Sequence, residues 1–140
     1  MRIEHTVEIA ASCATVWNVL TDLESWPDLT DSVTSVERVD PTPLHVGARV
    51  RLSQARLPDS EWTVTELVEG ERFTWVTKSP GVRVSASHTV RDQDGSTVLH
   101  LEVVQTGLLA STVGLTTVPM TRRYLSWEAE GIRKRAETTG

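Results

Sequence analysis

The fold is decided by residues 82–106, which read VRVSASHTVRDQDGSTVLHLEVVQT. Apolar and polar side chains alternate in both halves of this stretch, and a period of two is typical of a β-strand that buries one face. Between the halves, DQDG (92–95) is a strong signal for a tight hairpin turn. The stretch therefore predicts antiparallel strands at Val82–Val90 and Leu99–Gln105. The inner face of the first strand would carry Val82, Val84, Ala86, His88 and Val90.

Five further segments show the same alternation and are bounded by turns rich in Pro, Gly, Asp or Ser. They predict strands at Arg2–Ile9, Val33–Val39, Val46–Gln54, Glu61–Val68 and Phe73–Thr77. In the third strand of the chain, we expect the inner face to carry Val46, Ala48, Val50, Leu52 and Gln54. Seven short strands joined by short turns predict an antiparallel meander.

Helical spacing replaces this alternation in two regions. Ser12 is suited to cap a short helix that runs to Leu20, and Pro27 favours a second short helical start after it. From residue 107 to about 136 the period stays helical, which predicts a long amphipathic helix that is kinked or divided near Pro119. The predicted fold class is α+β: a curved, seven-stranded antiparallel sheet wrapped around a long C-terminal helix, with two short helices after the first strand.

This fold class predicts a cavity. A sheet of seven strands cannot leave its apolar face in water, and only one long helix is available to cover it. Side chains of ordinary size do not fill the hollow of a strongly curved sheet, so we expect space for an apolar small molecule between sheet and helix. No linker or repeat divides the chain, and residues 1–140 are expected to form a single domain.

The composition argues against several other classes of protein. The net charge of −5 disfavours nucleic-acid binding, which requires a basic face. No apolar run approaches the roughly 20 residues that span a bilayer, and no signal peptide is visible, so we expect a cytoplasmic protein. Cys13 is the single cysteine and the four histidines are scattered, so neither a metal nor another cofactor is expected. The edges of an open sheet leave both a monomer and a homodimer possible.

Several motifs give the chain a family resemblance. Residues 9–27 (IAASCATVWNVLTDLESWP), 46–49 (VGAR), 62–67 (WTVTEL), 94–97 (DGST) and 128–133 (EAEGIR) carry it. With the order of elements, these motifs resemble the START-like superfamily, also called SRPBCC or helix-grip, and in particular its small polyketide cyclase/dehydrase-like members. The resemblance implies a helix-grip fold and a cavity. It does not imply one chemistry, because members of the superfamily share the container and differ in its contents.

Ten residues are candidates for the cavity wall. The apolar contacts would come from Val50, Leu52, Trp62, Trp75, Leu101, Val113 and Met120, and the polar ones from Gln54, His88 and Tyr124. His88 interrupts an apolar strand face, and a buried imidazole needs a hydrogen-bond partner. It is either a core histidine bonded to Gln54, Gln105 or Tyr124, or a group that orients a ligand or transfers a proton.

Three function classes remain open at this point. The first is binding of a hydrophobic small molecule, such as a lipid, an isoprenoid or a polyketide. The second is a polyketide cyclase or dehydratase in which His88 and Tyr124 would act as acid and base. The alternation places Arg49, Arg51 and Arg83 on the outer face, so the cavity has no basic residue that would make an acid/base pair evident. The third is an interaction protein with a largely filled cavity. Whether the chain is an enzyme, and which residues are catalytic, is left open.

Overall fold

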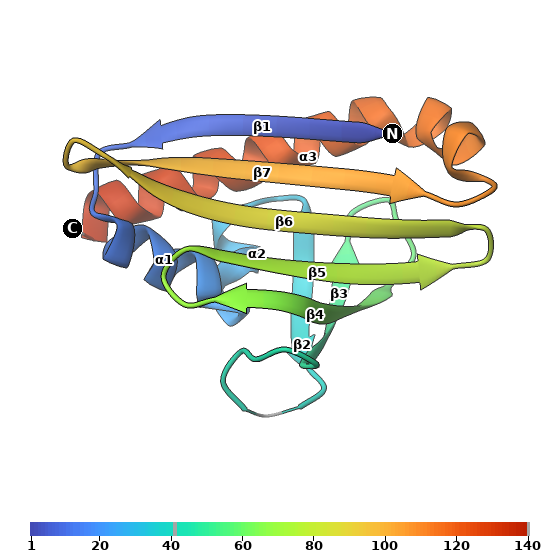
Figure 1. Cartoon of the computed structure of the whole chain (residues 1–140), viewed down its shortest axis with the longest axis horizontal. Coiled ribbons are helices and arrows are strands. Elements are labelled where there is room, and N and C mark those ends of the chain that lie inside the picture. Colours follow the sequence, from blue (N-terminus) through green and yellow to red (C-terminus); the bar gives the residue numbers. More distant parts are fainter. Residues whose placement is uncertain (41, 140) are drawn as a thin grey trace.

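The computed structural model describes residues 1–40 and 42–139, apart from the side chains of residues 113–116. Its strands are β1 (Arg2–Ile9), β2 (Val33–Arg38), β3 (Arg49–Gln54), β4 (Ser60–Val68), β5 (Arg72–Ser79), β6 (Val82–Gln93) and β7 (Ser96–Thr106). Its helices are α1 (Cys13–Thr21), the 3-10 helix η1 (Leu23–Ser25), α2 (Trp26–Leu29) and α3 (Ala110–Thr139). This order confirms the predicted α+β class (Figure 1).

The predicted hairpin forms the longest strand pair, between β6 and β7. Its turn consists of Asp94 and Gly95, whose φ angles are 51° and 91°. Positive φ at both central residues is what a type I′ hairpin turn requires. Because this turn uses only two residues, the pairing continues to Gln93 opposite Ser96, and both strands are longer than the sequence predicted.

All seven strands join one antiparallel sheet in the order β1-β7-β6-β5-β4-β3-β2. From β2 to β7 the order follows the chain, as predicted for a meander. β1 closes the far edge by pairing with β7, with Arg2 opposite Val104 and Ile9 opposite Thr97. The first and the last strand of the chain are thereby neighbours in a single curved sheet.

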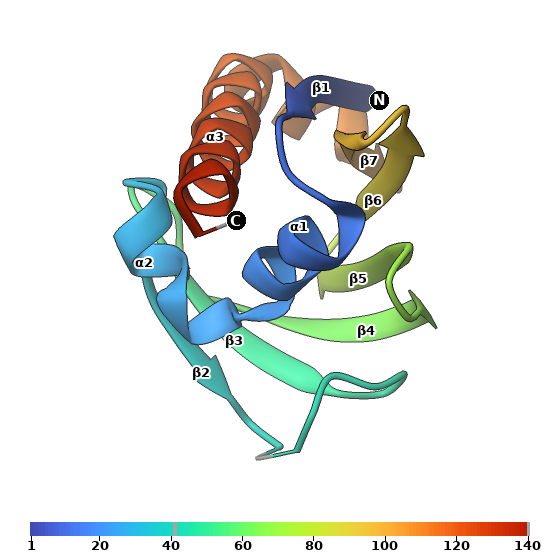
Figure 2. The same cartoon turned by 90° about the vertical axis from the view of Figure 1, so that its left-hand side faces the viewer.

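The helices occupy the hollow of this sheet. Figure 2 shows the strands as an arc, with α1, α2 and α3 inside it. α1 begins where the Ser12 hydroxyl accepts a hydrogen bond from the Thr15 amide at 3.2 Å, which confirms the predicted N-cap. α3 runs without interruption through Pro119, so its division into two helices is wrong. Within the described residues, no helix is both long and apolar enough to cross a bilayer.

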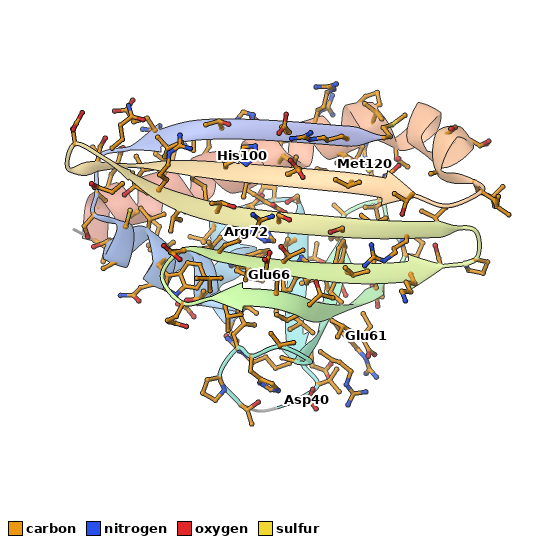
Figure 3. All side chains as sticks on the ribbon, in the orientation of Figure 1. Asp40, Glu61, Glu66, Arg72, His100 and Met120 are labelled. Atoms are coloured by element: carbon orange, nitrogen blue, oxygen red, sulfur yellow. The ribbon has the colours of Figure 1, made fainter. Side chains whose placement is uncertain are left out.

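The outer face of the sheet is polar and carries ion pairs (Figure 3). Arg49 lies 3.3 Å from Asp40 and 3.8 Å from Glu61, and Arg51 lies 3.7 Å from Glu61. Arg83 is exposed on the same face. The prediction that these arginines face away from the hollow is confirmed.

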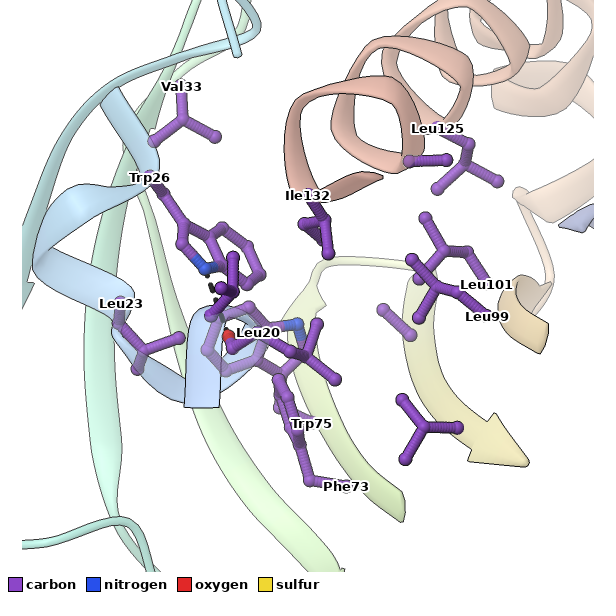
Figure 4. Packing of buried hydrophobic residues seen from close by; sticks show 14 of the residues in the cluster. Leu20, Leu23, Trp26, Val33, Phe73, Trp75, Leu99, Leu101, Leu125 and Ile132 are labelled. Carbon is purple, nitrogen blue, oxygen red and sulfur yellow. Dashed lines mark hydrogen bonds between the residues drawn. The ribbon is translucent and has the colours of Figure 1, made fainter. Parts of the chain in front are cut away.

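The inner face packs on the short helices through large aromatic side chains (Figure 4). Trp26 of α2 contacts Trp75 of β5, with ring centroids 5.5 Å apart, and donates its indole N–H to the Leu20 carbonyl at 3.0 Å. Phe73 contacts Trp75 at 5.3 Å. These contacts fix α2 against the middle of the sheet and close one end of the hollow.

The close approach of α3 to α2 depends on Gly131. A Cβ at this position would lie 2.0 Å from the Leu29 carbonyl oxygen, far inside contact distance. The glycine lowers intrinsic helix stability by roughly 1 kcal/mol relative to alanine. Here it lets the two helix backbones touch, which no larger residue allows.

The predicted start of the third strand is wrong. β3 begins at Arg49, and Val46 is 59% exposed where an inward side chain was expected. Gly47 has a φ of 95°, which redirects the chain between Val46 and Ala48 and breaks the period of two. Ala48, after the glycine, is buried as predicted.

We expect Gly131→Ala to destabilise the protein, although alanine favours helices. Overpacking costs about 1–3 kcal/mol, and the greater helix propensity of alanine offsets roughly 1 kcal/mol of it. Because the obstructing atom is backbone and cannot easily give way, a net loss of about 1–2 kcal/mol is expected in urea unfolding. Lys134→Ala, an exposed change on the same helix, is the control and should stay within about 0.5 kcal/mol of wild type. A Gly131→Ala variant as stable as wild type would contradict the close approach.

Candidate functional site

A cavity of about 620 Å³ lies between the inner face of the sheet and α3. This volume falls within the range of about 300–1,000 Å³ found for small-molecule sites. Its walls come from β3 to β7, from α2 and, within the described side chains, from the part of α3 between Thr117 and Glu128. A largely filled hollow, which would have favoured an interaction protein, is therefore not what the fold contains.

Most of the predicted wall residues meet around this cavity. Eight of the ten line it: Leu52, Gln54, Trp62, Trp75, His88, Leu101, Met120 and Tyr124. Val50, the ninth predicted residue, is 1% exposed within the hydrophobic core, and it is not among the residues that line the cavity. The side chain of Val113 lies outside the described residues.

Three tryptophans form an aromatic wall. Trp26, which the sequence did not place here, joins Trp62 and Trp75 in lining the cavity. The ring centroids of Trp62 and Trp75 are 5.8 Å apart, and the Trp62 indole N–H donates to the Ser60 hydroxyl at 2.8 Å. Among the described residues, no hydrogen bond uses the Trp75 indole N–H. This donor is left for an occupant of the cavity.

His88 is held by Phe73, which lies opposite it on the neighbouring strand β5, rather than by the partners predicted from sequence. Its ring stacks on Phe73, with centroids 4.1 Å apart, and its Nδ1 lies 3.3 Å from the Phe73 carbonyl oxygen. Gln54, Gln105 and Tyr124 are therefore wrong as partners, since a backbone carbonyl satisfies the ring. A carbonyl only accepts, so Nδ1 carries the hydrogen and Nε2 presents a lone pair.

The charge state of His88 follows from its surroundings. Burial lowers the pKa of His88 to about 4, although the bond to Phe73 opposes the shift. The imidazole is consequently neutral at pH 7. Within the described part of the chain Nε2 has no partner, which makes His88 a hydrogen-bond acceptor for a ligand that contacts the aromatic wall.

Tyr124 and Gln105 are tied to neighbouring elements. The Tyr124 hydroxyl donates to the Ala55 carbonyl, which binds α3 to the loop after β3. The Gln105 amide donates to the Thr117 hydroxyl at 3.4 Å, while its Oε1 is buried with no partner in the described residues. Tyr124 thus links α3 to the loop after β3, and its hydroxyl hydrogen is bonded to a backbone carbonyl.

Glu128 is the functional candidate that the sequence analysis missed. It lies one helical turn beyond Tyr124 on the same face of α3 and lines the cavity. It also borders a small recess with Trp26, Leu29 and Ile132. The available signal was helical spacing, because Glu128 lies four residues after Tyr124 and four before Ile132. A hydrophobic pattern does not select a charged residue for a cavity wall.

The carboxyl of Glu128 has no partner among the described residues. No hydrogen bond or ion pair reaches it, and burial is the single cause that raises its pKa to about 7. Part of its surface stays accessible because it faces the hollow. At neutral pH the carboxyl therefore exists in both its protonated and its ionised form.

The two ends of the cavity differ. At the inner end lie Glu128, Trp26 and His88, whose ring centroid is 5.9 Å from that of Trp26. At the other end, exposed Pro58 in the loop after β3 and exposed Pro80 at the β5–β6 turn line the wall. Since both prolines are exposed, this end of the cavity wall reaches the protein surface.

The outer face carries a second group of titratable side chains, remote from the cavity. Ligating atoms of Glu4, His100 and Glu102 lie within 4.8 Å of one another. Arg2 already pairs with both carboxylates, at 2.8 and 2.9 Å. The group is held together as an ion-pair network across β1 and β7.

A curved antiparallel sheet that closes on one long helix and encloses a cavity defines a helix-grip protein of the START-like class. A family model described as polyketide cyclase / dehydrase and lipid transport matches residues 1–137, so the chain belongs to that family. A comparison with curated proteins found no match.

Solved structures share this fold at low sequence identity. A hypothetical protein of Helicobacter pylori has 14% identity and a TM-score of 0.83, with 97% of this chain and 88% of that one covered. Truncated norcoclaurine synthase of Thalictrum flavum has 17% identity and a TM-score of 0.74, covering 96% and 91%. A START superfamily protein of Mycobacterium smegmatis has 16% identity and a TM-score of 0.70, covering 99% and 95%. At these identities the likeness establishes the fold alone.

Glu128→Gln should change how stability depends on pH. The folded protein keeps the Glu128 proton between pH 4.5 and about 7, where the unfolded chain releases it. Stability therefore falls as pH rises through this window, by up to about 1.4 kcal/mol per unit. We expect the glutamine variant to match wild type at pH 4 and to exceed it at pH 8 by up to ~3 kcal/mol in urea unfolding.

Glu130→Gln is the matched control for this measurement. Glu130 is on the same helix, and its pairing with Arg133 at 2.7 Å lowers the pKa of its carboxyl. Its replacement should give no gain at pH 8. If Glu128→Gln likewise gives no gain there, the carboxyl is solvated rather than buried.

Proposed function

We propose that the protein binds a hydrophobic small molecule in the cavity between the sheet and α3. The observation that carries this proposal is a hollow of about 620 Å³ with mainly apolar walls and a few polar groups at its inner end. Small-molecule sites have this composition, in which apolar area gives affinity and a few polar groups fix orientation. The family description, which includes lipid transport and polyketide cyclases, agrees with it.

The apolar wall accounts for affinity. Burial of apolar surface contributes about 25 cal/mol per Å² before the cost of ordering the ligand. A lipid, an isoprenoid or a polyketide has enough apolar surface to use such a wall. The residues proposed to contact it are Trp26, Leu52, Gln54, Trp62, Trp75, His88, Leu101, Met120, Tyr124 and Glu128.

The polar groups account for orientation. His88 offers an acceptor at Nε2, and Trp75 offers an unused indole N–H. A ligand that supplies partners for these two groups gains a net contribution of about 0.5–1.5 kcal/mol from each hydrogen bond. A ligand with its polar end at the inner end and its apolar tail toward Pro80 satisfies both groups.

Filling the cavity tests this proposal directly. Ala86 lines the cavity, whereas Ser85, the preceding residue of β6, points to the opposite face of the sheet. A leucine side chain at this position projects into the hollow and occupies space along the wall that the ligand would otherwise contact. We therefore expect Ala86→Leu to weaken binding of decanol by about tenfold in isothermal titration calorimetry.

Ser85→Leu is the control, with the same substituent on the outer face. It should bind decanol as wild type does. Thermal unfolding of both variants separates loss of binding from loss of fold. Wild type that binds neither decanol nor longer apolar alcohols would overturn the proposed function.

A second candidate function, acid–base catalysis, rests on Glu128. A carboxyl with a pKa of about 7 suits both removal and return of a proton at neutral pH. In dehydration of a β-hydroxy carbonyl chain, its carboxylate would take the α-proton and return it to the departing hydroxide, which leaves as water. Tyr124 is a poor candidate for the same role, because its hydroxyl donates to Ala55.

Turnover separates the two candidates. If the protein is such a dehydratase, Glu128→Gln should lower the rate of water loss from a β-hydroxyacyl thioester by about 100-fold or more. The measurement is single-turnover mass spectrometry with enzyme in excess. Glu130→Gln should retain the rate. Binding of the thioester by wild type without any water loss would leave binding as the function and exclude this reaction.

A further inference from the structure

The strongest unexplained feature of the cavity is that the carboxyl of Glu128 has no counter-charge among the described residues. Among the described lining residues the only cationic side chain is Lys78, which is exposed near the end of β5. Lys78 is five residues along β5 from Phe73, the neighbour of His88. At about 3.3 Å per residue, it lies roughly 16 Å from the inner end. Among the described residues no ion pair joins Lys78 to Glu128, and burial alone accounts for the raised pKa of that carboxyl.

The surroundings of Glu128 favour a positive charge by other means. Trp26, which borders the same recess, contacts Trp75 and His88. Indole rings attract cations through the negative potential of their faces. His88 adds an acceptor at Nε2 and stays neutral, so it brings no competing positive charge. The carboxyl, the lone pair and the aromatic rings all attract a hydrogen-bond donor that carries positive charge.

The other titratable groups near this end do not oppose such a ligand. Tyr124, on the same face of α3, donates its hydroxyl to Ala55. Asp28 of α2 is exposed to solvent. A buried carboxylate without a counter-charge is costly, and an ion pair with the occupant removes that cost. The missing counter-charge is therefore expected to come from the occupant.

We propose that the ligand of this protein is an apolar amine, whose protonated nitrogen binds Glu128 at the inner end of the cavity. The apolar tail then lies along the tryptophan wall toward the β5–β6 turn. This inference rests on the proposed function, since it assigns a substrate class to the same cavity. It separates amines from neutral alcohols and from fatty acids, whose carboxylates Glu128 repels.

The test compares decylamine, decanol and decanoate, which share one alkyl chain and differ in the charge of the head group. In calorimetric titrations at pH 8, wild type should bind decylamine at least about tenfold more tightly than decanol, and decanoate most weakly. In Glu128→Gln the ratio of the decylamine and decanol affinities should fall to about one. In Glu130→Gln, which removes a charge from the outer side of the same helix, the ratio should stay as in wild type.

A pH comparison in wild type keeps the test independent of the variants. At pH 5.5 Glu128 is largely protonated while alkylamines remain cationic, so the preference for decylamine should shrink by several-fold. Equal affinities for decylamine and decanol at pH 8, or a preference for decanoate, would overturn the amine assignment and leave the proposed function in place. Failure of all three probes to bind would instead count against the cavity as a ligand site.

Discussion

The seating of α3 in the hollow of the sheet is the contact on which the remaining architecture depends. Its C-terminal half is fully packed, because Leu125, Ala129, Ile132 and Ala136 are buried in the core. Gly131 brings this half against the Leu29 carbonyl of α2. The preceding part, from Thr117 to Thr121, is only half-buried or exposed and borders the cavity. One helix thus closes one end of the hollow with its packed half and borders the cavity with the half-buried stretch before it.

Sequence patterns predicted the container well and its polar contents poorly. Alternation in residues 82–106 settled the hairpin, since each inward side chain there is apolar or lies beside the aromatic wall. Val46 was misplaced because Gly47 adopts a positive φ that a period-two pattern does not register. His88 was given side-chain partners, whereas the Phe73 carbonyl bonds to it. A backbone partner depends on strand register, which the local pattern does not contain.

Glu128 and His88 show why polar residues of a cavity escape such patterns. A hydrophobic pattern treats charge as a sign of exposure, yet burial shifts both groups toward their neutral forms, raising the pKa of the acid and lowering that of the base. Their effects on stability depend on pH in opposite directions. As pH falls below 6.5, His88 destabilises the fold, because the unfolded chain takes up the proton more readily than the folded protein does. As pH rises above 4.5, Glu128 destabilises it, because the unfolded chain releases the proton more readily. Between pH 4.5 and 6.5 the two dependences have opposite slopes and largely cancel, so the effect of either group on stability shows only when the other is replaced.

The family motifs contain residues with two different tasks in this fold, since some build the container and others also line the cavity. Within residues 9–27, the Trp17 indole donates to Glu69 at 3.1 Å and the Trp26 indole donates to Leu20, so both tryptophans fasten the short helices. Gly131, in the C-terminal motif, permits the contact between α2 and α3. These residues build the container that many distant structures share at 14–17% identity. Glu128 lies three residues before Gly131 and faces the cavity, where a substitution leaves the backbone contact intact and alters only what the cavity attracts. Ligand specificity in such a fold can therefore change through single cavity-lining residues of a motif, while the neighbouring residues that build the container stay the same.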